Sequence, residues 1–280
     1  MPKQTEKKSA LTKQGYSLAV QRLFEKLYRP GASSFFFTGK QYRDICDSDE
    51  VVEANGGERI RNPADVLYAF RSRRKMPEAV EATAPAGKQW IIELAGREGG
   101  DSRYCFRLVN AESNLILPRD ELVPIDIPNA TPEIIGMYAL TDEQALLAKL
   151  RYNRLIDIFL GIAAFSLQSH LKTHVKEVGN VEVDELYVGL DKQGRHYIVP
   201  VQAKGGKDKL HSGQLKQDIA LCAEQYPKLI CRPVSAQFMS EARIALFELT
   251  VIKNEVKIID ERHYRLVPAK ALESASAAGT

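Results

Sequence analysis

The sequence predicts an α/β protein of the α+β kind, with a smaller N-terminal α+β domain followed by a mixed β-sheet flanked by helices. Two observations carry this prediction. From residue 141 onward, helical and strand spacing alternate in the order helix, three strands, helix, strand and a final hairpin. Before that, short helices lead into two strands joined by a glycine-rich turn. The 280 residues suffice for two ordinary domains.

The N-terminal half has helical apolar spacing first and strand spacing later. Pro30 and Gly31 end the first helix, and Pro63 stands where a first-turn proline is tolerated. The expected elements are helices over residues 17–29, 39–47 and 63–76 and a strand hairpin over 88–96 and 102–110.

Short helices that end in a basic helix and precede a hairpin indicate a winged-helix module. Such a module places one helix in the major groove, where arginines reach bases and phosphates. The basic residues best placed for this are Arg71, Arg73, Arg74 and Lys75. The alternative is an ordinary α+β domain whose arginines face water.

The C-terminal half begins with a predicted helix from residue 141 to about Lys172, broken near Gly161. The elements expected after it are strands over residues 172–178, 181–190 and 195–204, a helix over 212–226, a strand over 228–239 and a hairpin over 242–252 and 255–268. Four prolines make a continuous helix unfavourable over 111–135. The predicted organisation is a disordered tail at 1–14, a DNA-recognition domain at 15–110, a linker at 111–135, a second domain at 136–270 and a disordered tail at 271–280.

The composition excludes several classes of protein. No apolar run is long enough to cross a bilayer, and the polar, basic N-terminus does not resemble a secretory signal, so we expect a cytoplasmic protein with no membrane partner. The four cysteines are scattered without zinc spacing and are expected to be free thiols. The net charge of +3 is clustered in basic runs, of which Lys204–Lys209 is one.

Charged and polar residues interrupt two otherwise apolar strands at neighbouring positions. Asp184 lies within one strand, and Gln202 and Lys204 share a face at the end of the next. A four-residue turn makes these strands neighbours, so Asp184 can meet that pair. Asp184, the Gln202 amide and the Ala203 carbonyl are oxygen ligands of the kind that Mg²⁺ prefers. Lys204 would orient or deprotonate the attacking water, or stabilise the charge that develops on a phosphate. The alternative is an exposed ion pair of little consequence.

The stretch VEVDELYVGLDKQGRHYIVPVQAKGG, with a helix before and after it, resembles the PD-(D/E)xK nuclease superfamily. In that family an Asp of the second core strand and a (D/E/Q)-x-K of the third form the site. The resemblance implies Asp184 as the metal ligand and Gln202-Ala203-Lys204 as the second half. The Gln-x-Lys form is similar to the Mrr-like restriction endonucleases, and the resemblance covers about residues 142–240. Glutamine brings one negative charge fewer than glutamate. The candidates to compensate are Glu182, which shares a face with Asp184, and Glu185, which points away unless a bulge intervenes.

Other residues are weaker candidates for this site. The preceding helix often contributes a carboxylate in this superfamily, and Asp157 is the better candidate than Glu143, although we prefer to interpret Asp157 as a paired core aspartate. Gln217 on the following helix, and Lys207 and Lys209 as nucleic-acid contacts, complete the set. His170 and His174 lack a third metal ligand, so we expect a solvated or core-edge pair.

We therefore predict a deoxyribonuclease that uses Mg²⁺, with Mn²⁺ as the expected substitute. The expected type is a type II restriction endonuclease that acts on double-stranded DNA as a homodimer and has a cognate DNA methyltransferase in the same system. The alternatives are a structure-selective repair or recombination nuclease and an inactive DNA-binding regulator.

Overall fold

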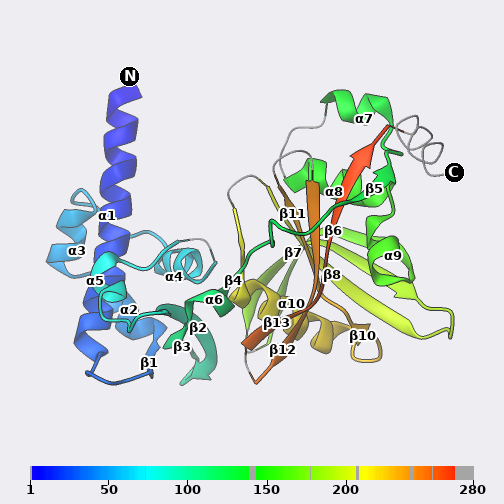
Figure 1. Cartoon of the computed structure of the whole chain (residues 1–280). Coiled ribbons are helices and arrows are strands. Elements are labelled where there is room, and N and C mark those ends of the chain that lie inside the picture. The colour runs from blue at the N-terminus through cyan, green and yellow to red at the C-terminus, as the bar shows by residue number, and fades with distance from the viewer. Residues whose placement is uncertain are drawn as a thin grey trace, which may run out of the picture. The chain divides into compact units, whose positions relative to one another are not determined.

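The computed structural model describes residues 2–72, 74–138, 143–176, 178–205, 208–239, 243–253 and 255–268. The chain forms two compact units, one of Met1–Asn114 with Glu177–Gly179 and the other of Leu115–Lys176 with Asn180–Thr280. Each unit combines helices and strands, which confirms the predicted mixed class (Figure 1). No helix in the described ranges is both long and apolar enough to span a membrane.

The first unit places its helices around a three-stranded antiparallel sheet in which β3 lies between β1 and β2. Its elements are α1 (Pro2–Leu27), β1 (Ser34–Thr38), α2 (Gly39–Cys46), α3 (Asp49–Ala54), α4 (Pro63–Ser72), α5 (Glu78–Glu81), β2 (Lys88–Glu98), β3 (Asp101–Asn110) and α6 (Ala111–Asn114). Helix α1 starts within the segment for which we expected no fixed structure.

Strand β1 is the strand of this unit that the sequence did not predict, and the short helices α3, α5 and α6 were not predicted either. It pairs with β3, about seventy residues later, and places Phe37 in the core. The core is aromatic, since the Phe24 ring centroid lies 4.9–5.3 Å from the centroids of Tyr28, Phe35, Trp90 and Phe106. The phenylalanines of β1 favour a strand, but five residues are too few to show a strand period, and pairing with β3 completes the element.

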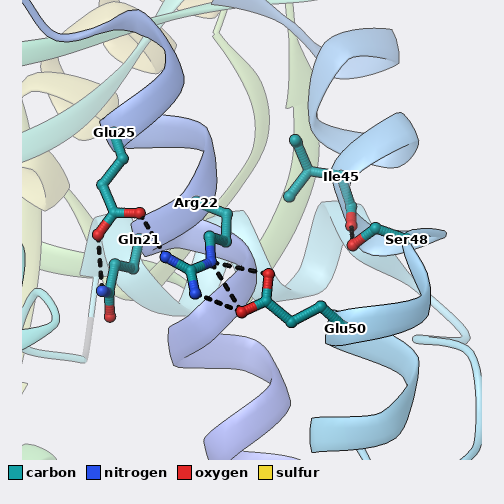
Figure 2. A network of polar contacts seen from close by, with 6 residues as sticks. All are labelled: Gln21, Arg22, Glu25, Ile45, Ser48 and Glu50. Carbon is teal, nitrogen blue, oxygen red and sulfur yellow. Dashed lines mark hydrogen bonds and ion pairs between the residues drawn. The ribbon is translucent and has the colours of Figure 1, made fainter.

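Polar contacts between α1 and α3 surround Arg22 (Figure 2). Its Nε donates to Glu50 Oε2 of α3 at 2.9 Å, and its Nη1 donates to Glu25 Oε2 of α1 at 2.7 Å. At the start of α3, the Ser48 hydroxyl donates to the Ile45 carbonyl at 2.8 Å. These side chains are exposed, so the contacts contribute little to stability beside the aromatic core.

The second unit is built on a mixed sheet with strand order β5-β13-β12-β11-β8-β7-β6. With β10, which also pairs with β8, the described chain contributes eight strands to it. The elements are β4 (Leu115–Ile116), β5 (Ile125–Pro128), α7 (Glu133–Tyr138), α8 (Glu143–Tyr152), α9 (Leu155–Leu160), β6 (Ala163–Val175), β7 (Gly179–Leu190), β8 (His196–Lys204), β9 (Leu210–His211), α10 (Ser212–Gln225), β10 (Ile230–Cys231), β11 (Val234–Phe238), β12 (Arg243–Ile252) and β13 (Glu255–Val267).

Helices cover both faces of this sheet (Figure 1). On one face, apolar residues of α8 and α9 pack with Val199, Val201 and Ala203 of β8. On the other, Leu215 of α10 packs with Phe247 of β12 and its neighbours. Side chains alternate along a strand, so the even-numbered residues of β8 face the α10 layer. Strand β8 is therefore buried on both sides.

Two expectations for this unit are corrected. The helix predicted to run to about Lys172 ends at Leu160, because Gly161 adopts a left-handed conformation with φ 66°. The following residues form the edge strand β6, in which Phe165 and Leu167 alternate with polar residues at a period of two. The proline-containing segment expected as a linker supplies β5, which pairs with β13, and β4, which pairs with β9.

The tight turn between β7 and β8 sets the register of the two strands. Asp191 accepts hydrogen bonds from the N–H groups of Gln193 and Arg195, from the Arg195 guanidinium and from the Tyr197 hydroxyl. Desolvation opposes ionisation here, but the Arg195 N–H and the other donors outweigh it and hold the pKa of Asp191 well below its usual range.

We predict that Asp191→Asn lowers stability at pH 7 and that the loss becomes smaller as the pH falls below about 3.9. A carboxyl whose folded pKa is depressed contributes stability above its unfolded pKa, about 3.9, and loses it as the pH falls through the folded value. Urea midpoints of both proteins, measured from pH 7 down to pH 2, check this. A difference that stays constant with pH would contradict the role of the charged carboxylate.

A buried ion pair attaches α8 to the sheet. Glu185 of β7 is fully buried, and its Oε1 lies 2.9 Å from Arg151 Nη2 of α8. The Ser166 hydroxyl of β6 donates to the same oxygen at 2.5 Å. The carboxylate thus holds a helix and two strands together, and α8 is the helix that carries Glu143.

We expect Arg151→Met to lower the free energy of unfolding by about 2 kcal/mol. The change keeps the apolar stem but leaves a buried carboxylate without its cation, and the half-exposed arginine keeps the loss below that of a fully buried pair. Chemical denaturation measures it, with Lys257→Met as the control. Lys257 forms an exposed pair with Glu255, so its change should stay within about 0.5 kcal/mol. Equal effects of the two substitutions would contradict the assignment.

Candidate active site on strands β7 and β8

The antiparallel pairing of β7 and β8 brings Asp184 beside the end of β8. Glu185 pairs with Val201 in the register, so Asp184 lies opposite the residues that follow. Its Oδ2 accepts a hydrogen bond from the Ala203 N–H at 2.8 Å. One carboxylate oxygen therefore fixes the side chain to the next strand, and the other is left to act as an acceptor.

Gln202 is almost completely buried, with 2% of its surface exposed. Its Nε2 donates to the Glu182 carbonyl at 3.0 Å and to Asp218 Oδ1 of α10 at 3.2 Å. These two bonds use both hydrogens of the amide nitrogen. The amide atom left to bind another group is the carbonyl oxygen, Oε1.

Lys204 pairs with the carboxylate at the start of α8. Its Nζ lies 3.3 Å from Glu143 Oε1, and its side chain is 11% exposed. Asp157, ranked above Glu143 from the sequence, bonds elsewhere: its Oδ1 accepts from the Ala164 N–H at 3.0 Å and from the Arg154 guanidinium. Asp157 is thus a paired structural aspartate, and Glu143 is the acid that α8 brings to Lys204.

Burial dominates the electrostatics of the site. It raises the pKa of Asp184, while the Lys204 ammonium and the Ala203 N–H act in the opposite direction. Burial also raises the pKa of Asp218 well above its ordinary value, with the Gln202 hydrogen bond opposing it and Asp184 adding to the rise. Burial and then the charge of Lys204 lower the pKa of His211. A bound cation would favour the charged carboxylates, because it supplies positive charge where water is scarce.

The donor atoms suit a hard cation that retains part of its water. Asp184, the Gln202 amide oxygen and the Ala203 carbonyl are all oxygen ligands, and Mg²⁺ typically uses one or two carboxylates and several waters. Across the described ranges, no three His, Cys, Asp or Glu side chains cluster as a metal-binding group. The amide and carbonyl oxygens would therefore have to complete any site that contains Asp184.

The remaining residues that the sequence proposed for this site have the following contacts and exposure. Glu182 pairs with Lys172 at 3.2 Å, and Gln217 is half-buried on α10, next to Asp218. Lys209 is half-buried before β9, whereas Lys207 lies outside the described residues. The two histidines of β6 have separate partners, namely Gln144 for His170 and Asn180 for His174.

Asp218 is the site residue that sequence reasoning missed. It is 1% exposed and lies on the buried face of α10, three residues after Leu215 and four before Cys222. An acid at that position of an amphipathic helix is the signal that would have identified it, since an ionisable side chain on an apolar face needs a partner.

In the first unit, the predicted basic helix end is only partly exposed. The Arg74 guanidinium lies over the Tyr16 ring, 5.2 Å from its centroid, and over the Phe70 ring. Arg71 is half-buried, and burial lowers its pKa despite the opposing effects of Tyr104 and other groups. Lys75 is exposed, and Arg73 lies outside the described residues.

No protein-family model matches the chain, and neither the curated proteins nor the solved structures contain a significant match.

Proposed function

We propose that this protein is a Mg²⁺-dependent DNA endonuclease of the PD-(D/E)xK type, most similar to type II restriction enzymes. The observation that carries the proposal is the meeting of Asp184 with Gln202-Ala203-Lys204 on neighbouring strands. Helix α8 packs on one face of those strands and α10 on the other. A carboxylate, an amide oxygen and a lysine at a sheet end match the donor set of a metal-dependent nuclease.

The proposed metal ligands are the Asp184 carboxylate, Gln202 Oε1 and the Ala203 carbonyl. When bound, Mg²⁺ would neutralise phosphate charge and lower the pKa of an attacking water. The Ala203 N–H holds the Asp184 carboxylate in place, so that little reorganisation is needed when a phosphodiester arrives.

Lys204 is the proposed group that meets the phosphate or the attacking water. Its ammonium is largely enclosed and is held by Glu143, which keeps the nitrogen at the end of the sheet. A positioned cation at that point stabilises negative charge that develops on the phosphate, and a lysine amine can also exchange a proton with water.

The first unit is the proposed DNA-binding part. Helices α2, α3 and α4 precede the β2–β3 hairpin, and β1 pairs with β3, an order that supports a winged-helix interpretation. The proposed contacts come from the end of α4, where Lys75 is exposed. Double-strand cleavage requires two cuts, so we propose a homodimer and, for a restriction system, a cognate methyltransferase as functional partner.

We expect the purified protein to cut plasmid DNA with Mg²⁺ or Mn²⁺, and Lys204→Ala to slow the cutting at least about 100-fold, because a positioned charge at the phosphate is lost. Gel analysis of a plasmid time course measures the rate, with Lys257→Ala as an exposed lysine control. Discrete fragments indicate a restriction enzyme, and a preference for branched DNA indicates a repair nuclease. Binding without cutting indicates the inactive regulator, and a Lys204→Ala rate equal to wild type refutes the site.

Substitutions of Glu143 in α8 and of Asp157 in α9 should have different effects on the cleavage rate in the same assay. Glu143→Gln removes the anion that holds Lys204 and should lower the single-turnover rate about 10- to 100-fold. Asp157→Asn should lower the melting temperature while leaving the rate per folded molecule unchanged, because its carboxylate bonds to Ala164 and Arg154. The reverse order of effects would place the wrong acid in the site.

A further inference from the structure

The glutamine at position 202 poses a chemical problem for the proposed site. A glutamine brings one less negative charge to a cation than glutamate, and an amide can present either its oxygen or its NH₂ group to a ligand. Only the oxygen can bind a metal. Something in the fold must therefore select the orientation of this amide.

Two acceptors surround the amide nitrogen. The Glu182 carbonyl comes from β7, the strand that also carries Asp184, and the Asp218 carboxylate comes from α10. The Glu182 carbonyl can only accept a hydrogen bond, so it selects the NH₂ group whatever the protonation state of Asp218, and Asp218 Oδ1 accepts from the same nitrogen. Together they turn the NH₂ group toward α10 and β7, which leaves Oε1 on the opposite side of the planar amide.

The contacts of Asp218 lead to the proposed site, because its side chain bonds to Gln202 and the charge of Lys204 acts on its carboxyl group. It lies on the apolar face of α10 with 1% of its surface exposed, where burying a carboxyl group is unfavourable unless it is hydrogen-bonded. Its one described side-chain partner is the Gln202 amide at 3.2 Å.

We propose that Asp218 is a positioning residue that orients Gln202 so that its amide oxygen faces the metal, and that it is the reason a glutamine stands at position 202. The inference rests on the proposed metal-dependent function of the same site. A glutamate at position 202 would place two carboxyl groups against each other in a buried layer, whereas an amide and a carboxylate are complementary.

The test combines substitutions at both positions and reads out metal binding and stability as well as cleavage. Mn²⁺ alone is titrated calorimetrically into the full-length protein, and melting temperatures are measured without metal. Asp218→Leu removes the acceptor but keeps the branching of the side chain, and it should weaken Mn²⁺ binding about 10- to 100-fold, as expected for loss of a group that orients a ligand. Asp218→Asn keeps an acceptor oxygen and should stay within about threefold of wild type.

The second part of the experiment moves the acid from position 218 to position 202 and gives the more specific test. Gln202→Glu alone should lower the metal-free melting temperature, because the new acid meets Asp218. In the Asp218→Asn background the same change should cost less stability and should bind Mn²⁺ more tightly than the single variant. Glu224→Gln on the exposed side of α10, where the side chain accepts from the Lys176 N–H, is the control and should leave both measurements unchanged.

The outcomes separate the inference from the function on which it rests. If wild type neither binds Mn²⁺ nor cuts DNA, the proposed function is wrong and the metal-orienting role falls with it. If wild type does both while Asp218→Leu binds Mn²⁺ equally well, only the inference is overturned. If Asp218→Leu fails to fold, Asp218→Asn, Gln202→Glu and their combination decide the question. Purely additive effects of the two substitutions on melting temperature and Mn²⁺ affinity would overturn the inference.

Discussion

Strand β8 is buried on both faces from Tyr197 to Ala203, and the polar groups in this stretch have to find partners inside the protein. This constraint organises the second unit. The backbone of β8 pairs with β7 on one side and with β11 and β10 on the other. The one polar side chain in the middle of this burial, Gln202, is bonded to β7 and α10 at the same time. Satisfying it joins the two strands that bear the proposed site to the helix behind them.

The same constraint explains why the site combines rigidity with unfavourable charge burial. Asp184 is held by a backbone N–H, and Lys204 is held by Glu143, so neither side chain depends on solvent for its position. Burial nevertheless raises the pKa of Asp184 and Asp218. A fold that accepts such groups in its interior holds carboxyl oxygens and a lysine ammonium in fixed positions, which suits the oxygens to a cation and the ammonium to an anion.

The opposite face of the sheet has a different polar arrangement. Glu185, one residue after Asp184, points toward α8, where it forms an ion pair with Arg151 and accepts a hydrogen bond from Ser166. Alternation along β7 thus sends two consecutive acids to two functions: one attaches α8, and the other lies at the proposed site. Because α8 also carries Glu143, the structural ion pair helps to place the acid that meets Lys204.

The sequence by itself determined the features that depend on short-range pattern. Alternation predicted β7, β8 and the C-terminal hairpin, the turn at Asp191 predicted that β7 and β8 are neighbours, and the order of elements predicted the mixed class. Strand β1 was missed because it is short and pairs with β3 about seventy residues later, and β6 was missed because its apolar residues were assigned to the preceding helix, although it pairs with the next strand along the chain.

Only the tertiary structure chose Glu143 over Asp157 and revealed Asp218. The sequence shows which acids lie on a helix, but three-dimensional packing decides which of them meets a lysine or an amide from another element. A buried polar group selects its partner by geometry across the fold, and that geometry is not contained in the spacing of residues along the chain.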